Sequence, residues 1–250
     1  MIQGLYVSAM GSAVQDLRMD VMANNLANVN TTGFKKELAL FMHRGLPQYP
    51  TGRHPVSLEP VAGGVLLART PALFDEGPLE ATHDPLHAAI QGEGFFAVAD
   101  PSGKVSLTRA GAFQRGNDGS LLTADGRYRV LGPGLVPVTV PPEAATVELR
   151  SDGTVLADGI EAGVLGRFRV PDTTRLTPLG DARFAMAPGD EPQASEAPLA
   201  VGMLEGANVE LVREMVASIE AARQMEMNLR LVKIQDELLG RTVREVARIG

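Results

Sequence analysis

The sequence predicts an α+β protein in which long N- and C-terminal helices pair in a coiled-coil-like layer and flank a central antiparallel β domain. Two observations support this prediction. Apolar residues recur at helical spacing near both ends, and the middle contains short β-prone runs separated by Asp-Gly turns. We therefore expect an N-terminal helix and turn over 1–35, an extended Pro/Gly-rich connector over 36–85, a central β domain over 86–202 and a C-terminal helix over 203–250.

The N-terminal segment carries two apolar stripes. From about Leu5 to Val29 it contains no Pro and no Gly other than Gly11, which permits one continuous helix. Two apolar faces on one helix imply two neighbours. The first stripe is Val7, Met10, Val14, Leu17 and Val21, continued by Asn24 and Asn28, and the second is Met19, Met22, Leu26 and Val29.

The Asn residues near the end of this helix allow two interpretations. A polar residue at a heptad position can fix the register between helices, whereas Asn near a helix end can cap the helix or meet solvent. The run Asn30-Thr31-Thr32-Gly33 is typical of a helix exit. Both interpretations stay open for Asn28, and register is favoured for Asn24.

The C-terminal segment, from about Asn208 to Ile249, shows a similar pattern. Gly206 and Asn208 signal its start, with Asn208 as the expected N-cap. Such a helix is roughly 50–60 Å long, too long for one small domain to cover. Its heptad line is Leu211, Met215, Ala222, Met225, Leu229, Val232, Leu239, Val243 and Val246, and a second face contains Val212, Val216, Ile219 and Leu231.

The middle of the chain divides into two parts. Residues 36–80 are rich in Pro and Gly, so we expect little regular structure there. Beyond residue 86, turns at Asp118-Gly119, Asp125-Gly126, Asp152-Gly153 and Asp158-Gly159 separate short β-prone runs, which predicts an antiparallel domain. The expected strands lie within 90–99, 105–108, 121–122, 128–131, 136–140, 147–149 and 164–170.

Composition excludes several classes of partner. Among 250 residues, 44% are hydrophobic and 21% charged, as in a globular protein. The net charge of −7 argues against nucleic acid and against an anionic membrane surface, because both require a concentrated basic face. The absence of Cys excludes disulfides. No basic leader precedes the first apolar residues and no apolar run approaches the ~20 residues that span a bilayer, so we expect no cleaved signal peptide and no membrane insertion.

No pattern in the sequence indicates catalysis. His83 and His87 flank Pro85, which disrupts the helix that a two-histidine metal site requires. Gly92-Glu93-Gly94 leads into an aromatic β-prone run and not into a helix, so a tight turn is favoured over a dinucleotide loop. We therefore predict no enzyme, no catalytic or metal-binding residue, no cofactor and no small-molecule substrate.

The segment Ala23-Asn24-Asn25-Leu26-Ala27-Asn28-Val29-Asn30-Thr31-Thr32-Gly33-Phe34-Lys35-Lys36 resembles the signature of the flagellar rod and hook family. Three further stretches are similar to that family: Ile90–Phe96, Thr108–Phe113, and Asn208-Val209 with Glu220–Met227. The last of these is most like the proximal-rod type, although Met225 stands where an aromatic residue is usual.

The resemblance implies a structural subunit of the bacterial flagellar basal-body rod. It implies self-assembly for cell motility, export by the flagellar type III apparatus without a cleaved signal peptide, and a rod that spans the periplasm. The expected partners are further copies of the chain, other rod and hook subunits and the export apparatus. In this family the terminal helices form an inner layer and the β domain lies outside.

Energetics favour the same arrangement. Burying one heptad line yields about 1.5–3 kcal/mol per residue, against about 1–2 kcal/mol of backbone entropy for each residue ordered. A long helix with only one buried face is therefore marginally stable, and neighbouring copies can cover the second face. A head-to-tail contact of this kind does not close, so it generates a filament.

We expect the assembly interface to comprise the first stripe, the Asn-rich helix end and the C-terminal heptad line. Two alternatives stay open: a distal-rod subunit of the same family, and a non-flagellar coiled-coil adaptor. The expected interface residues are Val7, Met10, Val14, Leu17, Val21, Asn24, Asn25, Leu26, Asn28, Gly33, Phe34, Leu211, Met215, Ala222, Met225, Leu229, Val232, Leu239 and Val243.

Overall fold

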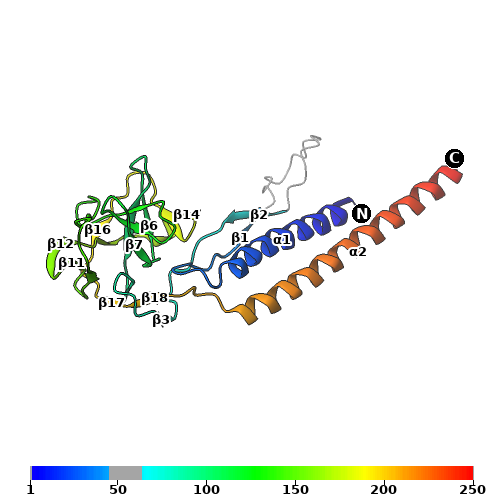
Figure 1. Cartoon of the computed structure of the whole chain (residues 1–250). Helices are drawn as coiled ribbons and strands as arrows, with labels where there is room; N and C mark the ends of the chain where they lie inside the picture. Colours follow the sequence, from blue (N-terminus) through cyan, green and yellow to red (C-terminus); the bar gives the residue numbers. More distant parts are fainter. Residues whose placement is uncertain (1, 45–63, 250) are drawn as a thin grey trace. The chain divides into compact units, whose positions relative to one another are not determined.

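The computed structural model describes residues 2–44 and 64–249 and confirms the α+β class (Figure 1). The chain forms two compact units. The helical unit comprises residues 1–26, 37–70 and 211–250, and the β unit comprises 27–36 and 71–210. Among the described residues, no helix is both long enough and apolar enough to cross a membrane.

The helical unit contains the two predicted helices, α1 (Ile2–Ala27) and α2 (Leu211–Ile249), which lie side by side (Figure 1). They run antiparallel, because Asn25 near the end of α1 is hydrogen-bonded to Glu214 in the first turn of α2, while Gly11 lies against Asn228 farther along α2. Gly11 permits this close approach, since a Cβ atom there would lie 3.1 Å from the Asn228 amide nitrogen.

The β unit is built on a nine-stranded sheet in which all pairs are antiparallel, as predicted. Its order is β14-β15-β6-β5-β9-β8-β7, with β13 paired to both β5 and β16. These strands are β5 (Phe95–Ala99), β6 (Val105–Thr108), β7 (Phe113–Arg115), β8 (Leu121–Thr123), β9 (Arg129–Val130), β13 (Arg167–Arg169), β14 (Thr177–Gly180), β15 (Arg183–Ala185) and β16 (Gln193–Ala194).

Three smaller antiparallel sheets complete this unit. One has the order β10-β11-β12, and the other two are the pairs β17-β4 and β18-β3. A single-turn 3-10 helix, Thr173–Arg175, precedes β14. The strands are β3 (Leu79–Ala81), β4 (Ala88–Ile90), β10 (Val147–Leu149), β11 (Thr154–Ala157), β12 (Ile160–Val164), β17 (Leu199–Val201) and β18 (Met203–Glu205).

Strand β5 separates two hydrophobic clusters. Every residue of β5 is buried, and successive side chains point to opposite faces of the sheet. Phe96 packs edge-to-face on Phe113 in one cluster, with ring centroids 5.1 Å apart. Phe95 packs against Phe74 in the other cluster, at 5.2 Å. The predicted aromatic core strand is therefore confirmed.

The Asp-Gly turns were predicted correctly. Gly119, Gly126, Gly153 and Gly159 all have positive φ, between 71° and 88°. In three of these turns the Asp side chain accepts a hydrogen bond from the backbone two residues on, as in Asp152 to Thr154. Strands β8 and β11 each lie between two such turns.

Three expectations were wrong. Residues 36–80, for which we expected little regular structure, include a hairpin of β1 (Leu40–Arg44) and β2 (Gly64–Arg69), and residues 45–63 lie outside the described residues. Residues 136–140 make isolated bridges and no strand, because Pro137 lacks the N–H that a ladder needs. Asn208 is not an N-cap: α2 begins at Leu211, and the Asn208 side chain is bonded elsewhere.

Candidate functional site

The chain turns sharply after α1. The backbone N–H of Thr31 donates to the carbonyl of Asn28 at 3.0 Å, and the Thr31 hydroxyl donates to the Asn28 side chain at 3.2 Å. This confirms the predicted helix exit. Gly33 follows with φ of +69°, and a Cβ atom there would lie 2.2 Å from the backbone nitrogen of Ala110. Only glycine fits this turn without displacing the neighbouring backbone.

Phe34 is buried inside the β unit. Its side chain is 7% exposed and belongs to a small hydrophobic cluster with Ala182, Ala207 and Val209, against which Val29 also packs. This cluster joins the signature segment to the segment that precedes α2. Gly33 and Phe34, which we expected at an interface between copies, therefore have direct partners within the chain.

Lys35 forms a buried ion pair with Glu205. The Lys35 Nζ atom lies 2.6 Å from Glu205 Oε1, and the two side chains are 0% and 1% exposed. The ammonium also donates to the carbonyl of Asp75 at 2.6 Å. The same Glu205 oxygen accepts from the backbone N–H of Gly77 at 3.0 Å. The pair therefore holds three separate segments of the chain.

Arg109 completes what we call the ion cluster: Lys35, Arg109 and Glu205. Its Nη1 atom lies 3.4 Å from Glu205 Oε2, and Nη2 donates to the carbonyl of Gly92 at 2.8 Å. The guanidinium carbon also lies 5.4 Å from the centre of the Phe95 ring. Because the side chain is 3% exposed, these contacts replace water around the charge.

Burial dominates the electrostatics of the cluster. It lowers the pKa of Lys35, against the opposing effect of the hydrogen bond to Glu205. It likewise lowers the pKa of Arg109, against the attraction of Glu205 and Glu76. Two cations face one buried carboxylate, and Glu76 supplies a second, exposed carboxylate whose oxygen accepts from Gly92 N–H at 2.7 Å.

Asn208 makes a second connection between the same segments. Its Oδ1 atom accepts from the backbone N–H of Lys36 at 2.7 Å. Its Nδ2 atom donates to the carbonyls of Leu73 and Asp75, at 2.9 and 3.1 Å. The Leu73 N–H in turn donates to the carbonyl of Lys36 at 2.8 Å. The Asn208 side chain therefore connects three segments of the β unit by hydrogen bonds. Because its polar atoms are used in these bonds, it does not cap α2.

The four stretches that resemble the rod and hook family meet at this place. Lys35 lies in the signature segment, Gly92 and Phe95 in the second stretch, Arg109 in the third and Asn208 in the fourth. The sequence did not identify Lys35, Arg109 or Glu205 as site residues. The available signal was that each of these charged residues lies within two positions of a Gly and next to a Phe, Ala or Gly.

Asn25 is the buried member of the Asn-rich helix end. It is 1% exposed, and its amide accepts from the N–H of Glu37 at 2.9 Å and donates to the Glu37 carbonyl at 3.0 Å. Asn24 is exposed and hydrogen-bonded to the Glu37 carboxyl, whose pKa is raised by burial and lowered in part by that bond. Asn25 thus secures the chain where it returns to the helical unit.

The remaining predicted residues of α1 lie partly buried within the helical unit. Met10, Val14, Val21 and Leu26 are half-buried, while Leu17 is 37% exposed. The side chain of Val7 lies outside the described residues, as does that of Val243 in α2.

Helix α2 has two contrasting faces. The buried face carries Glu214 and Ala221, followed by half-buried residues that include Met225, Val232 and Leu239. Ala222 is also half-buried, whereas Leu211, Met215 and Leu229 are 44–49% exposed. The opposite face, which we call the exposed α2 face, consists of Val212, Val216, Ile219, Met227, Leu231, Ile234 and Leu238.

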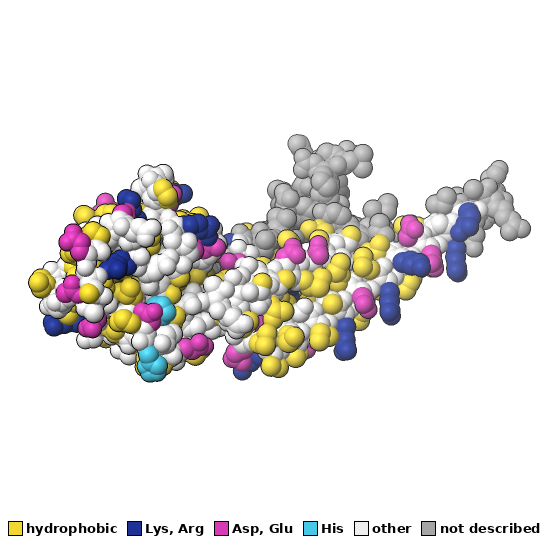
Figure 2. Space-filling view, in the orientation of Figure 1, with side chains coloured by type: hydrophobic (Ala, Val, Ile, Leu, Met, Phe, Trp, Pro, Cys, Tyr) yellow, Lys and Arg dark blue, Asp and Glu magenta, His cyan; other side chains and the backbone are white. Residues whose placement is uncertain are grey.

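The side chains of the exposed α2 face are 48–70% exposed and recur three or four residues apart within the groups 212–219 and 227–238. Figure 2 shows hydrophobic side chains gathered along this helix. The sequence identified four of these residues as a second face.

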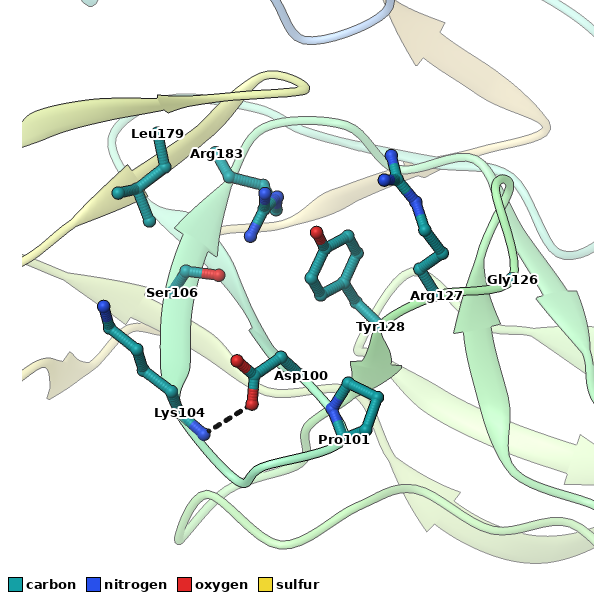
Figure 3. A pocket seen from close by; sticks show the side chains of 9 residues that line it. All are labelled: Asp100, Pro101, Lys104, Ser106, Gly126, Arg127, Tyr128, Leu179 and Arg183. Atoms are coloured by element: carbon teal, nitrogen blue, oxygen red, sulfur yellow. Dashed lines mark hydrogen bonds between the residues drawn. The ribbon is translucent and has the colours of Figure 1, made fainter.

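Three surface cavities lie among the described residues of the β unit. One, of about 580 Å³, is lined by Tyr128, Arg183, Arg127, Lys104 and others, and Figure 3 shows these side chains around the opening. The Arg183 guanidinium stacks 3.9 Å from the Tyr128 ring centre. Arg127 donates to Asp125 and Asp181, at 2.7 and 2.8 Å. The arginines are thus engaged by partners within the chain.

His83 and His87 lie at a turn before β4. His83 is exposed with φ of +58°, and His87 Nδ1 lies 2.9 Å from the Thr82 hydroxyl. Within 2–44 and 64–249, no three His, Asp or Glu side chains are grouped so that they could hold a metal ion.

Comparison with known proteins agrees with this arrangement. Residues 5–35 match the flagella basal body rod protein family, 89–157 the flagellar hook protein FlgE/F/G D1 domain, and 200–245 the flagellar basal body rod FlgEFG protein C-terminal region. The chain is 30% identical to the flagellar basal-body rod protein FlgG of Borreliella burgdorferi, over 96% of this chain and 97% of that protein. The chain belongs to the flagellar basal-body rod protein family.

Two further members of the rod family come from Caulobacter vibrioides. The chain is 31% identical to its FlgG, over 96% of this chain and 98% of that protein. It is 32% identical to its FlgF over the full length of both chains. The regions that match the family models contain Lys35, Arg109, Glu205 and most of both helices, so the ion cluster and the helix pair both lie in parts similar to the rod family.

Proposed function

We propose that this chain is a structural subunit of the flagellar basal-body rod, of the proximal-rod type, that polymerises through its terminal helices into a helical shaft. The rod family is a structural family and not an enzyme family, and it belongs to the flagellar basal body. The single observation that carries the mode of assembly is the exposed α2 face.

The exposed α2 face has the composition of an interface core. Val212 is 70% exposed and Ile219 is 55% exposed, on the side of the helix opposite to the buried Glu214 and Ala221. Covering a fully exposed side chain of this type yields about 1.5–3 kcal/mol, so seven half-exposed side chains yield roughly 5–10 kcal/mol per copy. This total is of the same order as the free-energy cost of the translational and rotational freedom that a subunit loses on association, about 4–15 kcal/mol. One contact is therefore weak, and a stable assembly requires repeated contacts.

We assign the expected interface residues to two roles. Leu17 on α1 and Leu211, Met215 and Leu229 on α2 are exposed and can contact another copy directly. The half-buried residues of both helices form the coiled-coil-like pair within one chain. This pairing places the apolar stripes between α1 and α2 and leaves the exposed α2 face for neighbours.

The division of the chain follows from this proposal. The helices of the terminal segments 1–35 and 203–250 form the inner layer of the rod, and residues 86–202 form its outer domain. Export through the flagellar type III apparatus, without a cleaved signal peptide, delivers the subunit to a rod that spans the periplasm. Mass spectrometry of the N-terminus in purified basal bodies tests the processing, since removal of a leader contradicts it.

The resemblance of Glu220–Met227 to the proximal-rod type supports this assignment. The distal-rod type is the alternative. The relatives named FlgG and FlgF do not choose between them. A tag inserted at the exposed Asp158-Gly159 turn, located by electron microscopy of basal bodies, tests the assignment. Density at the end of the rod nearest the cell interior is expected, and density at the opposite end contradicts the proximal type.

The mode of assembly is tested with charges on α2. We expect Ile219→Asp and Leu229→Asp to abolish incorporation into the rod and motility, while the thermal unfolding of the β unit is unchanged. Gln224→Asp, which adds the same charge at an exposed polar position of the same helix, is the matched control. Normal rods from both apolar-to-Asp variants contradict the proposal, and sedimentation as a closed dimer supports the adaptor alternative.

A further inference from the structure

The segment that follows α1 is bonded to the segment that precedes α2 at three places, while residues 205–208 are also bonded to residues 73–79 and to Arg109. The Gly33 N–H donates to the Glu205 carbonyl at 2.7 Å, Lys35 Nζ donates to the Glu205 carboxylate at 2.6 Å, and the Lys36 N–H donates to the Asn208 side chain. All three bonds connect residues 33–36 to residues 205–208. The segment 73–77 contributes further bonds to both.

We propose that the ion cluster is a clasp that makes the docking of residues 33–36 on the β unit conditional on the docking of residues 205–208, and the reverse. Neither segment is then held by the β sheet alone. The clasp acts within a single chain and does not depend on polymerisation.

The chemistry of the cluster supplies the coupling. If residues 205–208 detach, the Lys35 ammonium keeps only the Asp75 carbonyl and Arg109 loses its buried carboxylate. An uncompensated buried charge is strongly unfavourable, so residues 33–36 detach as well. If residues 33–36 detach, Glu205 keeps Arg109 at 3.4 Å and the Gly77 N–H, but loses its closest cation.

The small residues of the clasp reinforce this dependence. A Cβ atom at Gly33 would overlap the backbone of Arg109 and Ala110, and one at Gly77 would lie 2.0 Å from the carbonyl oxygen of Gly206. Gly33 therefore packs backbone against backbone on residues 109–110, and Gly77 does so on Gly206, so a shift of either segment disturbs its neighbour. Thermodynamic reciprocity requires that each terminal segment stabilise the other by the same factor.

Amide hydrogen exchange measures the clasp directly in the full chain. The reporters for one segment are the amides of Gly33 and Lys36, whose hydrogen bonds end on residues 205 and 208. The reporter for the other segment is the Gly206 amide, which donates to the Pro78 carbonyl at 2.8 Å. The Leu131 amide, which donates to Ala97 in β5, reports on the core sheet.

We expect Glu205→Gln to accelerate exchange at Gly33 and Lys36 by at least about 100-fold, because a buried ammonium loses its counter-ion. By reciprocity, Lys35→Met should accelerate exchange at Gly206 by more than about 10-fold, less than the first effect because Arg109 still faces Glu205. Exchange at Leu131 should stay within about 3-fold in both variants. Arg175→Gln, which breaks the partly exposed ion pair with Asp190, is the matched control and should change the exchange of none of these amides.

Two results overturn the clasp. One is unchanged exchange at Gly33 and Lys36 in Glu205→Gln. The other is acceleration of all reporters by one factor, because the cluster is then an ordinary part of the core. If Glu205→Gln does not fold, Asn208→Ala provides the test, because it removes the hydrogen bonds of the Asn208 side chain and leaves the charges of the ion cluster unchanged. Selective acceleration at Lys36 and Gly33 supports the clasp, and none contradicts it.

Discussion

Gly33→Ala tests whether the turn after α1 depends on close backbone packing or only on an unusual backbone conformation. At φ of +69° an L-residue is disfavoured by about 1–2 kcal/mol. The added Cβ atom, 2.2 Å from the Ala110 nitrogen, must displace the segment, which costs about 1–3 kcal/mol. Losing the hydrogen bond from Gly33 to Glu205 costs about 0.5–1.5 kcal/mol more. We therefore expect Gly33→Ala to lower the free energy of unfolding of the β unit by about 3–6 kcal/mol.

The matched control is Gly159→Ala. Gly159 has φ of +81°, but no atom lies within 4 Å of a Cβ atom built there. Its substitution should therefore cost only about 1–2 kcal/mol. Any stabilisation from a less flexible unfolded chain is common to both variants and cancels. Calorimetry of the β transition should show Tm lowered by roughly 6–20 °C for Gly33→Ala and by a few degrees for the control. Equal losses in the two variants would refute the argument from close packing.

Three further predictions follow from the packing and the charges. Phe96→Ala should lower the unfolding free energy of the β unit by about 3–5 kcal/mol, whereas Ile160→Ala at an exposed position should stay within about 0.5 kcal/mol, as denaturant titration will show. Gly11→Leu should separate α1 from α2 and lower the helical signal at 222 nm at a given temperature, and an unchanged melt contradicts the pairing. Backbone hydrogen bonds lower the pKa of Asp152 and Asp158, so their stabilisation is present above their ordinary pKa and lost as pH falls through the lowered value. Replacing both with Asn should flatten the loss of stability on acidification below about pH 4.

The parts of the fold that the sequence predicted are those encoded locally. Helical spacing fixed the existence of α1 and α2, and the Asp-Gly pairs fixed the turns at Gly119 and Gly153, because both depend on neighbours within a few residues. The hairpin of β1 and β2 was missed because its strands are separated by a long Pro/Gly-rich segment. Asn208 was misassigned because a local capping rule could not anticipate its bonds to Lys36 and Leu73.

The ion cluster could not be predicted from local sequence patterns, because its members are far apart in the sequence. Lys35 and Glu205 are 170 positions apart, and Arg109 and Glu205 are 96 apart. No periodicity relates such residues, and charged residues are usually placed at the surface in sequence-based predictions. The resemblance selected Lys35 and Arg109 as parts of motifs, but only the fold brings them to one carboxylate.

The burial of the signature residues predicts two distinct classes of assembly-defective variants. Gly33, Phe34 and Lys35 are buried in the chain, so substitutions there should prevent assembly indirectly, by loosening the terminal segments from the β unit. Ile219 is exposed, so Ile219→Asp should prevent assembly while the chain keeps its normal Tm. Measuring Tm and rod incorporation for both kinds of variant separates the classes. A normal Tm for a non-assembling Phe34→Ala variant would show that Phe34 contacts a neighbouring subunit and does not act indirectly.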